Sequence, residues 1–189
     1  MTKSDIIYWG RKLVSMGFCT SFFGNISFRD AKDIYITKTT TMLDELSEND
    51  IVMVDLKSDI YPKEASSEYI VHKGIYDKTD YTHIIHVHTD YAILMDLFDH
   101  DYVTYDYGEV LDFLKKVPIV KGKSGSVELM KNISSAINEN PVVIAFRHGI
   151  FAAGKSFKEC YIYLSALEYY SKEKYLRSIF NDKTKRGLP

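Results

Sequence analysis

The chain has 189 residues, a length sufficient for one domain with a well-covered hydrophobic core. Hydrophobic residues make up 46% and charged residues 26%, and the formal net charge of −2 excludes a general electrostatic attraction to nucleic acid or to an anionic membrane. Two cysteines without a Cys-x-x-Cys pair, an N-terminal segment without an apolar run, and no apolar stretch near the roughly 20 residues that span a bilayer together predict a cytoplasmic protein.

The N-terminal part of the sequence predicts one helix, three short strands and a second helix. The first helix is expected over about residues 4–16, because Trp9, Leu13 and Met16 share one face and Gly17 follows as a stop signal. Short strand-like segments follow at residues 25–28, 33–37 and 51–54. A second helix is then expected to open at Ser66 and Ser67 and to carry Glu68, Val71 and Ile75.

The C-terminal part predicts further strands and three helices. In chain order we expect a strand at 83–88, a helix at about 91–98, a strand at 117–120, a helix at about 126–137 and strands at 142–146 and 150–153. In the last helix, Ser156 and Glu159 have the spacing of a capping box, and apolar residues recur at helical intervals from Tyr163 to Tyr170. This order favours a mixed or antiparallel sheet covered by helices, in one domain over residues 1–189, rather than a doubly wound parallel sheet.

Three histidines give the strongest chemical signal in the sequence. His86 and His88 are two residues apart on a predicted strand, so both imidazoles point to one face while Val87 points to the core. His148 follows an apolar strand, whose end is able to present a third imidazole. Three neutral imidazoles and one open position are typical of a catalytic zinc site, in which the metal acts as a Lewis acid. A His-x-His pair alone is equally compatible with a structural or chance pairing at a strand end.

Glu68 and two groups of polar residues extend this candidate site. Glu68 lies at the start of a predicted helix, where a carboxylate either interacts with the helix dipole or acts as a general base beside a metal. Ser66 and Ser67 either cap this helix or bind a phosphate through their hydroxyls and the backbone N–H groups of the helix start. Gly24 and Asn25 form either a simple turn or a second part of an anion site.

Five short motifs, in this order and spacing, resemble those of the class II aldolase/adducin family over about residues 5–175. The motifs are Gly24-Asn25-Ile26-Ser27, Ile36-Thr37-Lys38-Thr39-Thr40, Ser66-Ser67-Glu68, His86-Val87-His88 and Arg147-His148-Gly149. The resemblance implies a three-layer α/β/α sandwich around a mostly antiparallel mixed sheet. It also implies a homotetramer with C4 symmetry whose active sites lie between subunits, with a small sugar phosphate as the partner molecule.

The resemblance further implies a role for each site residue. His86, His88 and His148 would bind zinc. Glu68 would exchange a proton at the substrate carbon and contact the metal when no substrate is bound. The phosphate of a dihydroxyacetone-phosphate unit would be bound by Gly24, Asn25, Thr39, Ser66 and Ser67.

The chain departs from the family pattern in three places. Lys38 and Thr40 stand where family members commonly have Pro and Gly. The aldolases of the family use a tyrosine from a neighbouring subunit after the His-x-His segment, and Tyr107 fits that spacing best, with Tyr105 close behind. The segment after Phe180 contains no tyrosine, whereas the aldolases and 4-epimerases place one in a longer C-terminal segment, so the acid that protonates the leaving aldehyde is not identified.

The reaction implied is the reversible, zinc-dependent cleavage of a ketose phosphate, such as L-fuculose 1-phosphate, to dihydroxyacetone phosphate and an aldehyde. An L-ribulose-5-phosphate 4-epimerase is disfavoured, because its tail tyrosine has no counterpart. A methylthioribulose-1-phosphate dehydratase also uses zinc and a glutamate. Its usual Ala-Glu or Ser-Cys version of the Ser-Ser-Glu motif is absent, although Arg147-His148-Gly149 is similar to dehydratase sequences. A non-catalytic adducin-like interaction domain would be expected to lose the metal histidines, and all three are present.

Overall fold

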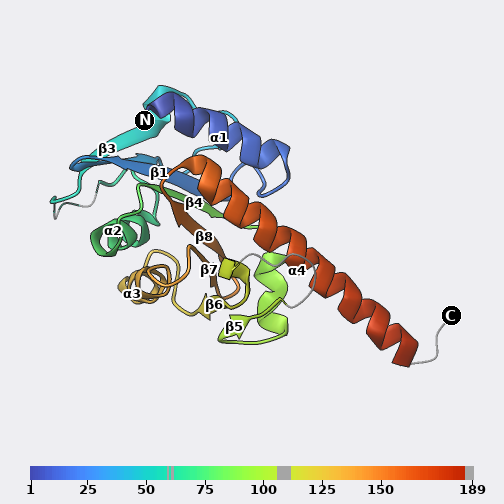
Figure 1. Ribbon diagram of the computed structural model, residues 1–189. Helices are drawn as coiled ribbons and strands as arrows, with labels where there is room; N and C mark the ends of the chain where they lie inside the picture. Colours follow the sequence, from blue (N-terminus) through green and yellow to red (C-terminus); the bar gives the residue numbers. More distant parts are fainter. Residues whose placement is uncertain (59, 61, 106–111, 186–189) are drawn as a thin grey trace.

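The computed structural model describes residues 1–58, 60, 62–105 and 112–185, and one mixed sheet runs through this part of the chain (Figure 1). Its eight strands lie in the order β3-β2-β1-β4-β8-β7-β6-β5. The strands are β1 (Gly24–Asp30), β2 (Asp33–Thr37), β3 (Ile51–Asp55), β4 (His83–Val87), β5 (Tyr102–Val103), β6 (Val117–Val120), β7 (Val142–Ala145) and β8 (Gly149–Gly154). The α-helices are α1 (Lys3–Ser15), α2 (Tyr69–Lys78), α3 (Val127–Ala136) and α4 (Phe157–Lys185). The 3₁₀ helices are η1 (Glu48–Asp50), η2 (Ala92–Leu97) and η3 (Asp112–Leu114).

Neighbouring strands of this sheet are antiparallel at every pairing except one. Strands β6 and β7 are parallel, and α3 forms the crossover that a parallel pair requires. A hairpin joins β1 and β2, a short turn joins β7 and β8, and a longer connection that contains η1 joins β2 and β3. The predicted α/β fold around a mostly antiparallel mixed sheet is therefore confirmed. The expectation of one domain over residues 1–189 stays a prediction.

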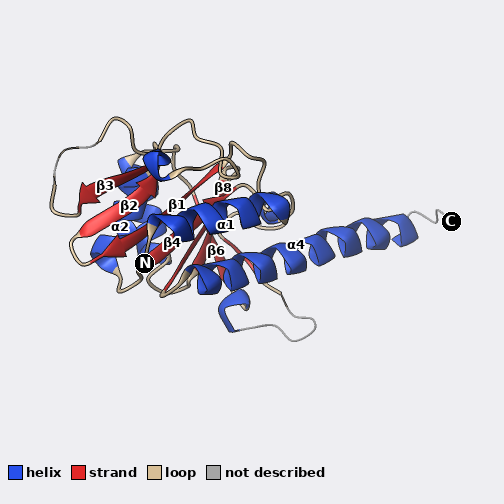
Figure 2. Ribbon diagram, turned by 90° about the horizontal axis from the view of Figure 1, so that it is seen from above, coloured by secondary structure: helices blue, strands red, loops and turns tan. Residues whose placement is uncertain are grey.

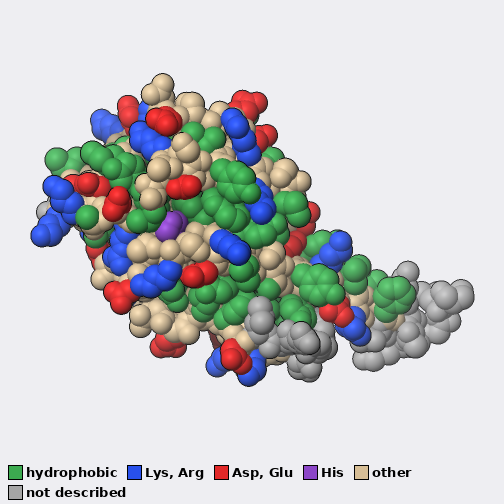
Figure 3. All heavy atoms as spheres, turned by 45° about the horizontal axis from the view of Figure 1, so that its top comes forward, with side chains coloured by type: hydrophobic (Ala, Val, Ile, Leu, Met, Phe, Trp, Pro, Cys, Tyr) green, Lys and Arg blue, Asp and Glu red, His purple; other side chains and the backbone are tan. Residues whose placement is uncertain are grey.

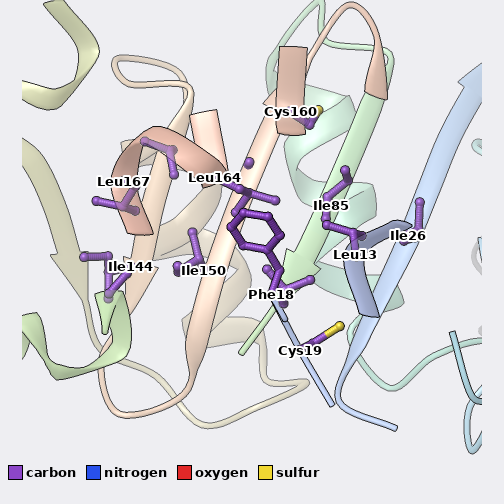
Figure 4. Packing of buried hydrophobic residues seen from close by; sticks show 14 of the residues in the cluster. Leu13, Phe18, Cys19, Ile26, Ile85, Ile144, Ile150, Cys160, Leu164 and Leu167 are labelled. Carbon is purple, nitrogen blue, oxygen red and sulfur yellow. The ribbon is translucent and has the colours of Figure 1, made fainter. Parts of the chain in front are cut away.

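The two faces of the sheet bury separate hydrophobic layers, because successive strand residues point to opposite sides. On one face, α1 and α4 cover Ile26, Ile85 and Ile150. Figure 4 shows this layer, with Leu13 of α1 and Leu164 of α4 among its labelled side chains. On the opposite face, α2 and α3 cover the strand residues whose side chains point the other way, which include Ile84, Phe151 and Val143. Helices thus lie on both sides of the sheet, as Figures 1 and 2 show, and complete the predicted three layers.

Several element boundaries differ from the expected ones. The segment expected as a helix at about 91–98 is the 3₁₀ helix η2, and the carboxylate of Glu168 in α4 accepts hydrogen bonds from the backbone N–H groups of Tyr91 and Ala92 at its start. Helix α2 begins only at Tyr69, so the preceding serines lie in the turn before it rather than in its first turn. Strand β5 was not predicted, since two residues are too few for a periodic signal.

The last helix begins as predicted and is longer than the apolar pattern indicated. The Ser156 hydroxyl accepts a hydrogen bond from the backbone N–H of Glu159 at 3.2 Å, and the Glu159 carboxylate accepts one from the backbone N–H of Lys155 at 2.8 Å. The C-terminal part of α4 projects from the rest of the molecule (Figure 2). None of the helices in the described ranges combines the length and the apolar character needed to cross a bilayer.

Candidate functional site

One cavity of about 380 Å³ brings together most of the residues that the sequence singled out. It lies where β1 begins and β4 ends, beside the start of α2 and the turn between β7 and β8. Its lining residues are Phe22, Phe23, Gly24, Asn25, Lys38, Thr39, Thr40, Thr41, Ser66, Ser67, Glu68, His86, His88, Ser124 and His148. Every predicted metal-binding and phosphate-binding residue is on this list, together with the predicted base.

The three histidines converge at one end of the cavity. The Nδ1 atom of His86 donates a hydrogen bond to the Ile150 carbonyl oxygen at 2.9 Å, which leaves the lone pair on Nε2. The Nε2 atoms of His86 and His88 are 3.1 Å apart, close to the roughly 3.3 Å between two nitrogens on a tetrahedral zinc ion. One ring nitrogen from each of the two and from His148 lies within 4.8 Å of the others. The three imidazoles are therefore placed to hold a metal ion.

Burial and the neighbouring side chains keep the three imidazoles neutral. Burial lowers the pKa of His86 well below its ordinary value, and the neighbouring His88 and His148 lower it further. Burial, followed by His148, lowers the pKa of His88 to about 4. Burial also lowers the pKa of His148, against the opposing effect of the Glu68 carboxylate. Neutral imidazoles at neutral pH are the protonation state that metal binding requires.

The backbone at residues 147–149 directs the third histidine into the cluster. Arg147 has a left-handed backbone with φ +53°, which reverses the chain between β7 and β8 just before His148. Its Nε atom lies 3.3 Å from Oδ2 of Asp96, a carboxylate that is only 4% exposed. Gly149 then passes very close to the other two histidines. A Cβ atom at this position would lie 2.8 Å from Cε1 of His86 and 2.8 Å from Cδ2 of His88, so only glycine fits without displacement.

Glu68 adjoins the histidines, and although it is the N-cap residue of α2, its side chain forms no capping hydrogen bond. Its side chain is buried, and Oε1 lies 3.7 Å from Nε2 of His148. The same Oε1 accepts hydrogen bonds from the Ser124 hydroxyl and from the Gly125 backbone N–H, the latter at 3.0 Å. Oε2 is buried and has no hydrogen-bond partner within the described part of the chain. The carboxylate is thus held through one oxygen, while the other remains available for a proton.

The loop that holds Glu68 packs tightly against the serine turn. Gly125 has φ +66°, and a Cβ atom there would lie 2.9 Å from the Ser67 carbonyl oxygen. Glycine at this position lets the backbone N–H of residue 125 reach the Glu68 carboxylate. No pattern in the sequence linked Ser124 to a glutamate 56 positions earlier.

Polar side chains also line the cavity beside the histidines. Asn25 pairs with His86 in the β1–β4 register, and its buried Oδ1 has no hydrogen-bond partner among the described residues. The turn at Ser66 is tied to the end of β2 by a 3.1 Å hydrogen bond from the Ser66 N–H to the Thr37 carbonyl oxygen. Thr39 is held nearby by a 2.9 Å hydrogen bond from its N–H to the Glu64 carbonyl oxygen. These ties bring together hydroxyl and amide groups that are able to bind a phosphate.

Neither candidate tyrosine is among the described residues that line this cavity. Tyr107 lies outside the described residues. Tyr105 is buried, and its hydroxyl forms a 2.6 Å hydrogen bond with the Ser171 hydroxyl of α4, so it does not line the cavity. Sequence patterns also missed the aromatic rim, where Phe23 stacks on the His88 ring with 5.4 Å between ring centroids.

Comparison with known proteins finds a matching family model, similar sequences and a similar solved structure. The family described as Class II Aldolase and Adducin N-terminal domain matches residues 4–175. An L-fuculose phosphate aldolase of Methanococcus maripaludis is 34% identical over 147 residues, which cover 77% of this chain and 80% of the relative. A methylthioribulose-1-phosphate dehydratase of Sulfurihydrogenibium is a more distant relative, 29% identical over 84% of this chain and 81% of its own. The solved L-fuculose-1-phosphate aldolase of Thermus thermophilus has the same fold, with a TM-score of 0.87, 24% identity and 95% of each chain covered.

Proposed function

The chain belongs to the class II aldolase and adducin family and is an aldolase of that class, and on this premise we propose that it cleaves a ketose 1-phosphate reversibly into dihydroxyacetone phosphate and an aldehyde. L-Fuculose 1-phosphate is the first candidate substrate, because the relative of 34% identity is an L-fuculose phosphate aldolase. The family relationship that the five motifs predicted is thereby confirmed. A methylthioribulose-1-phosphate dehydratase remains the alternative to be tested.

The observation that carries this proposal is that two sets of groups line one cavity. Three neutral imidazoles and the Glu68 carboxylate form one set, and Asn25, Ser66 and Ser67 belong to the other. A ketose 1-phosphate carries the matching groups close together, because its phosphate is on C1, beside the C2 carbonyl, and C3 on the other side of that carbonyl carries a hydroxyl. The cavity is therefore suited to bind both groups of the same molecule.

At the metal end, His86, His88 and His148 would hold a zinc ion, which when bound supplies the positive charge that polarises a carbonyl and stabilises negative charge on its oxygen. Glu68 would exchange a proton with the substrate carbon through its available Oε2. The hydrogen bonds from Ser124 and Gly125 to Oε1 would keep this carboxylate oriented during the transfer.

The phosphate oxygens would be bound by Gly24, Asn25, Thr39, Ser66 and Ser67. The side chains of Thr39, Ser66 and Ser67 offer hydroxyl donors, and Asn25 offers an amide. Hydrogen bonds from several neutral donors orient a phosphate without fixing its charge state. These residues would hold the substrate so that its carbonyl faces the histidines.

We also propose that the active unit is a homotetramer whose sites lie between subunits, with Tyr107 as the residue that a neighbouring subunit contributes. Apolar side chains exposed at the cavity rim and along α4 support an interface. Phe22 and Phe23 are each 51% exposed at the rim, and Tyr169 and Leu176 are 64% and 42% exposed on α4. Figure 3 shows hydrophobic side chains on the projecting part of this helix. The cytoplasm stays the expected location.

A substrate panel tests the reaction. Zinc-loaded protein is incubated with L-fuculose 1-phosphate, other ketose 1-phosphates, ribulose 5-phosphate and methylthioribulose 1-phosphate. Release of dihydroxyacetone phosphate, measured by a coupled dehydrogenase, is the expected result, and a chelator should abolish it until zinc is restored. A dehydrated diketone or an epimer as the sole product would overturn the aldolase proposal for the substrate tested.

A further inference from the structure

Lys38 has a distinctive place in the charge distribution of the cavity. Among the described residues that line it, Lys38 is the sole lysine or arginine and Glu68 is the sole carboxylate. Histidines that bind a metal ion do so as neutral imidazoles. The described lining residues therefore bring one ammonium group and one carboxylate to this cavity.

The fold holds Lys38 directly beside the serine turn. Lys38 follows the last residue of β2, and its backbone forms an antiparallel bridge with Ala65, the residue before Ser66. Its carbonyl oxygen accepts a 2.9 Å hydrogen bond from the Thr41 hydroxyl, which stabilises the loop that follows Lys38 in the chain. The side chain of Lys38 thus starts from the same part of the cavity wall as Ser66.

Within the described part of the chain, the ammonium group of Lys38 forms a weak ion pair with Glu64 and interacts electrostatically with Asp50. Its Nζ atom lies 3.6 Å from Oε2 of Glu64, and the two side chains are 33% and 72% exposed. A solvent-exposed ion pair at this distance contributes little to stability and exchanges partners readily. The lysine is therefore free to move its flexible four-carbon side chain from Glu64 to an anion inside the cavity.

On the premise of the proposed function, we propose that Lys38 determines the preference for a phosphorylated substrate, by leaving Glu64 and pairing with the substrate phosphate. The charges support this role. Lys38 and Glu68 cancel, so the two positive charges of a divalent metal match the two negative charges of a phosphate dianion. Without Lys38 the loaded cavity would keep one uncompensated negative charge in a partly buried site, which is unfavourable. A proline, common at this position in the family, offers no such charge.

Binding measurements on the zinc-loaded protein test this role without turnover. The probe is dihydroxyacetone phosphate, with unphosphorylated dihydroxyacetone as the comparison, and the dissociation constants are measured by calorimetry. Lys38→Met should weaken binding of the phosphorylated probe about 10–100-fold, the range for losing a charge-assisted hydrogen bond, and leave dihydroxyacetone unaffected. Glu64→Gln should strengthen binding of the phosphorylated probe severalfold, since it removes the competing carboxylate.

A neighbouring lysine provides the matched control. Lys63→Met removes the same charge from the connection between β3 and α2, beside Glu64, but Lys63 is exposed and is not among the lining residues of the cavity, so binding should stay within about twofold. Wild-type affinity of Lys38→Met for the phosphorylated probe would overturn the proposal, as would an equal effect of Lys63→Met. Should Lys38→Met fail to fold, unchanged binding by Glu64→Gln would overturn it instead. Intact phosphate binding without aldol cleavage would refute the proposed function and leave this inference standing.

Discussion

Substitution of Gly149 tests whether close packing of the sheet holds the histidine cluster together. Replacement by alanine would place a Cβ atom 2.7 Å from the Val87 carbonyl oxygen and 2.8 Å from atoms of both His86 and His88. Ordinary contact begins at 3.4 Å, so the neighbours would have to move by about 0.6–0.7 Å. Metal–ligand distances tolerate only about 0.2 Å, and the two imidazoles are themselves the atoms that must move.

We therefore expect Gly149→Ala to weaken zinc binding at least about 10-fold, the lower end of the range for disturbing the groups that orient metal ligands. Overpacking should also lower the free energy of unfolding by about 1–3 kcal/mol. Zinc affinity is measured by competition with a chromophoric chelator on protein that is folded by circular dichroism.

Gly17 supplies the control for a generic glycine effect. It has φ +75°, and a Cβ atom there would meet nothing within 4 Å. Gly17→Ala should cost about 1–2 kcal/mol of stability through backbone strain alone and leave zinc affinity unchanged. Wild-type zinc affinity in Gly149→Ala would refute the argument that this close approach positions the histidines.

Three other substitutions probe the base, the loop and the buried histidine. Glu68→Gln should retain zinc but slow dihydroxyacetone phosphate release about 10²–10⁴-fold, because an amide cannot accept the proton; full activity would exclude Glu68 as the base. Thr40→Gly should raise the free energy of unfolding in urea by up to about 1 kcal/mol, since Thr40 has φ +61°, a strained backbone for a β-branched residue; an unchanged midpoint would contradict this. Burial lowers the pKa of His72 to about 3, so only the unfolded chain gains this proton as pH falls below about 6.5. Metal-free protein should then lose about 1.4 kcal/mol per pH unit through His72 alone, and His72→Gln should reduce that slope in urea titrations between pH 7 and pH 5.

Local periodicity predicted much of the fold and part of the site. Side chains alternate across a strand, which correctly predicted that Val87 is buried in the layer under α1 and α4. His86 lies on the other face, where its ring stacks on Phe151 with 4.0 Å between centroids. The capping interaction of Ser156 was predictable for the same reason, since its partner is three residues away. Such features depend on residues that are close in sequence.

Tertiary contacts decided the features that local patterns did not predict. Apolar spacing indicated a helix at about 91–98, but that segment is a 3₁₀ helix whose first N–H groups bind Glu168, 77 positions away from Tyr91. The orientation of Glu68 likewise depends on Gly125, 57 positions away. These contacts exist because the sheet and helices pack in one particular arrangement.

The sequence by itself determined which residue types were available for metal and phosphate chemistry, and that His86 and Val87 stand on opposite faces of one strand. Only the tertiary structure decided that Lys38 lies beside Ala65 and that Arg147 turns the chain toward His86. The physical reason is the distance along the sequence over which each interaction acts. Side-chain periodicity and capping act over a few residues, whereas a site assembled from β1, β4, α2 and the β7–β8 turn forms only when those elements pack together.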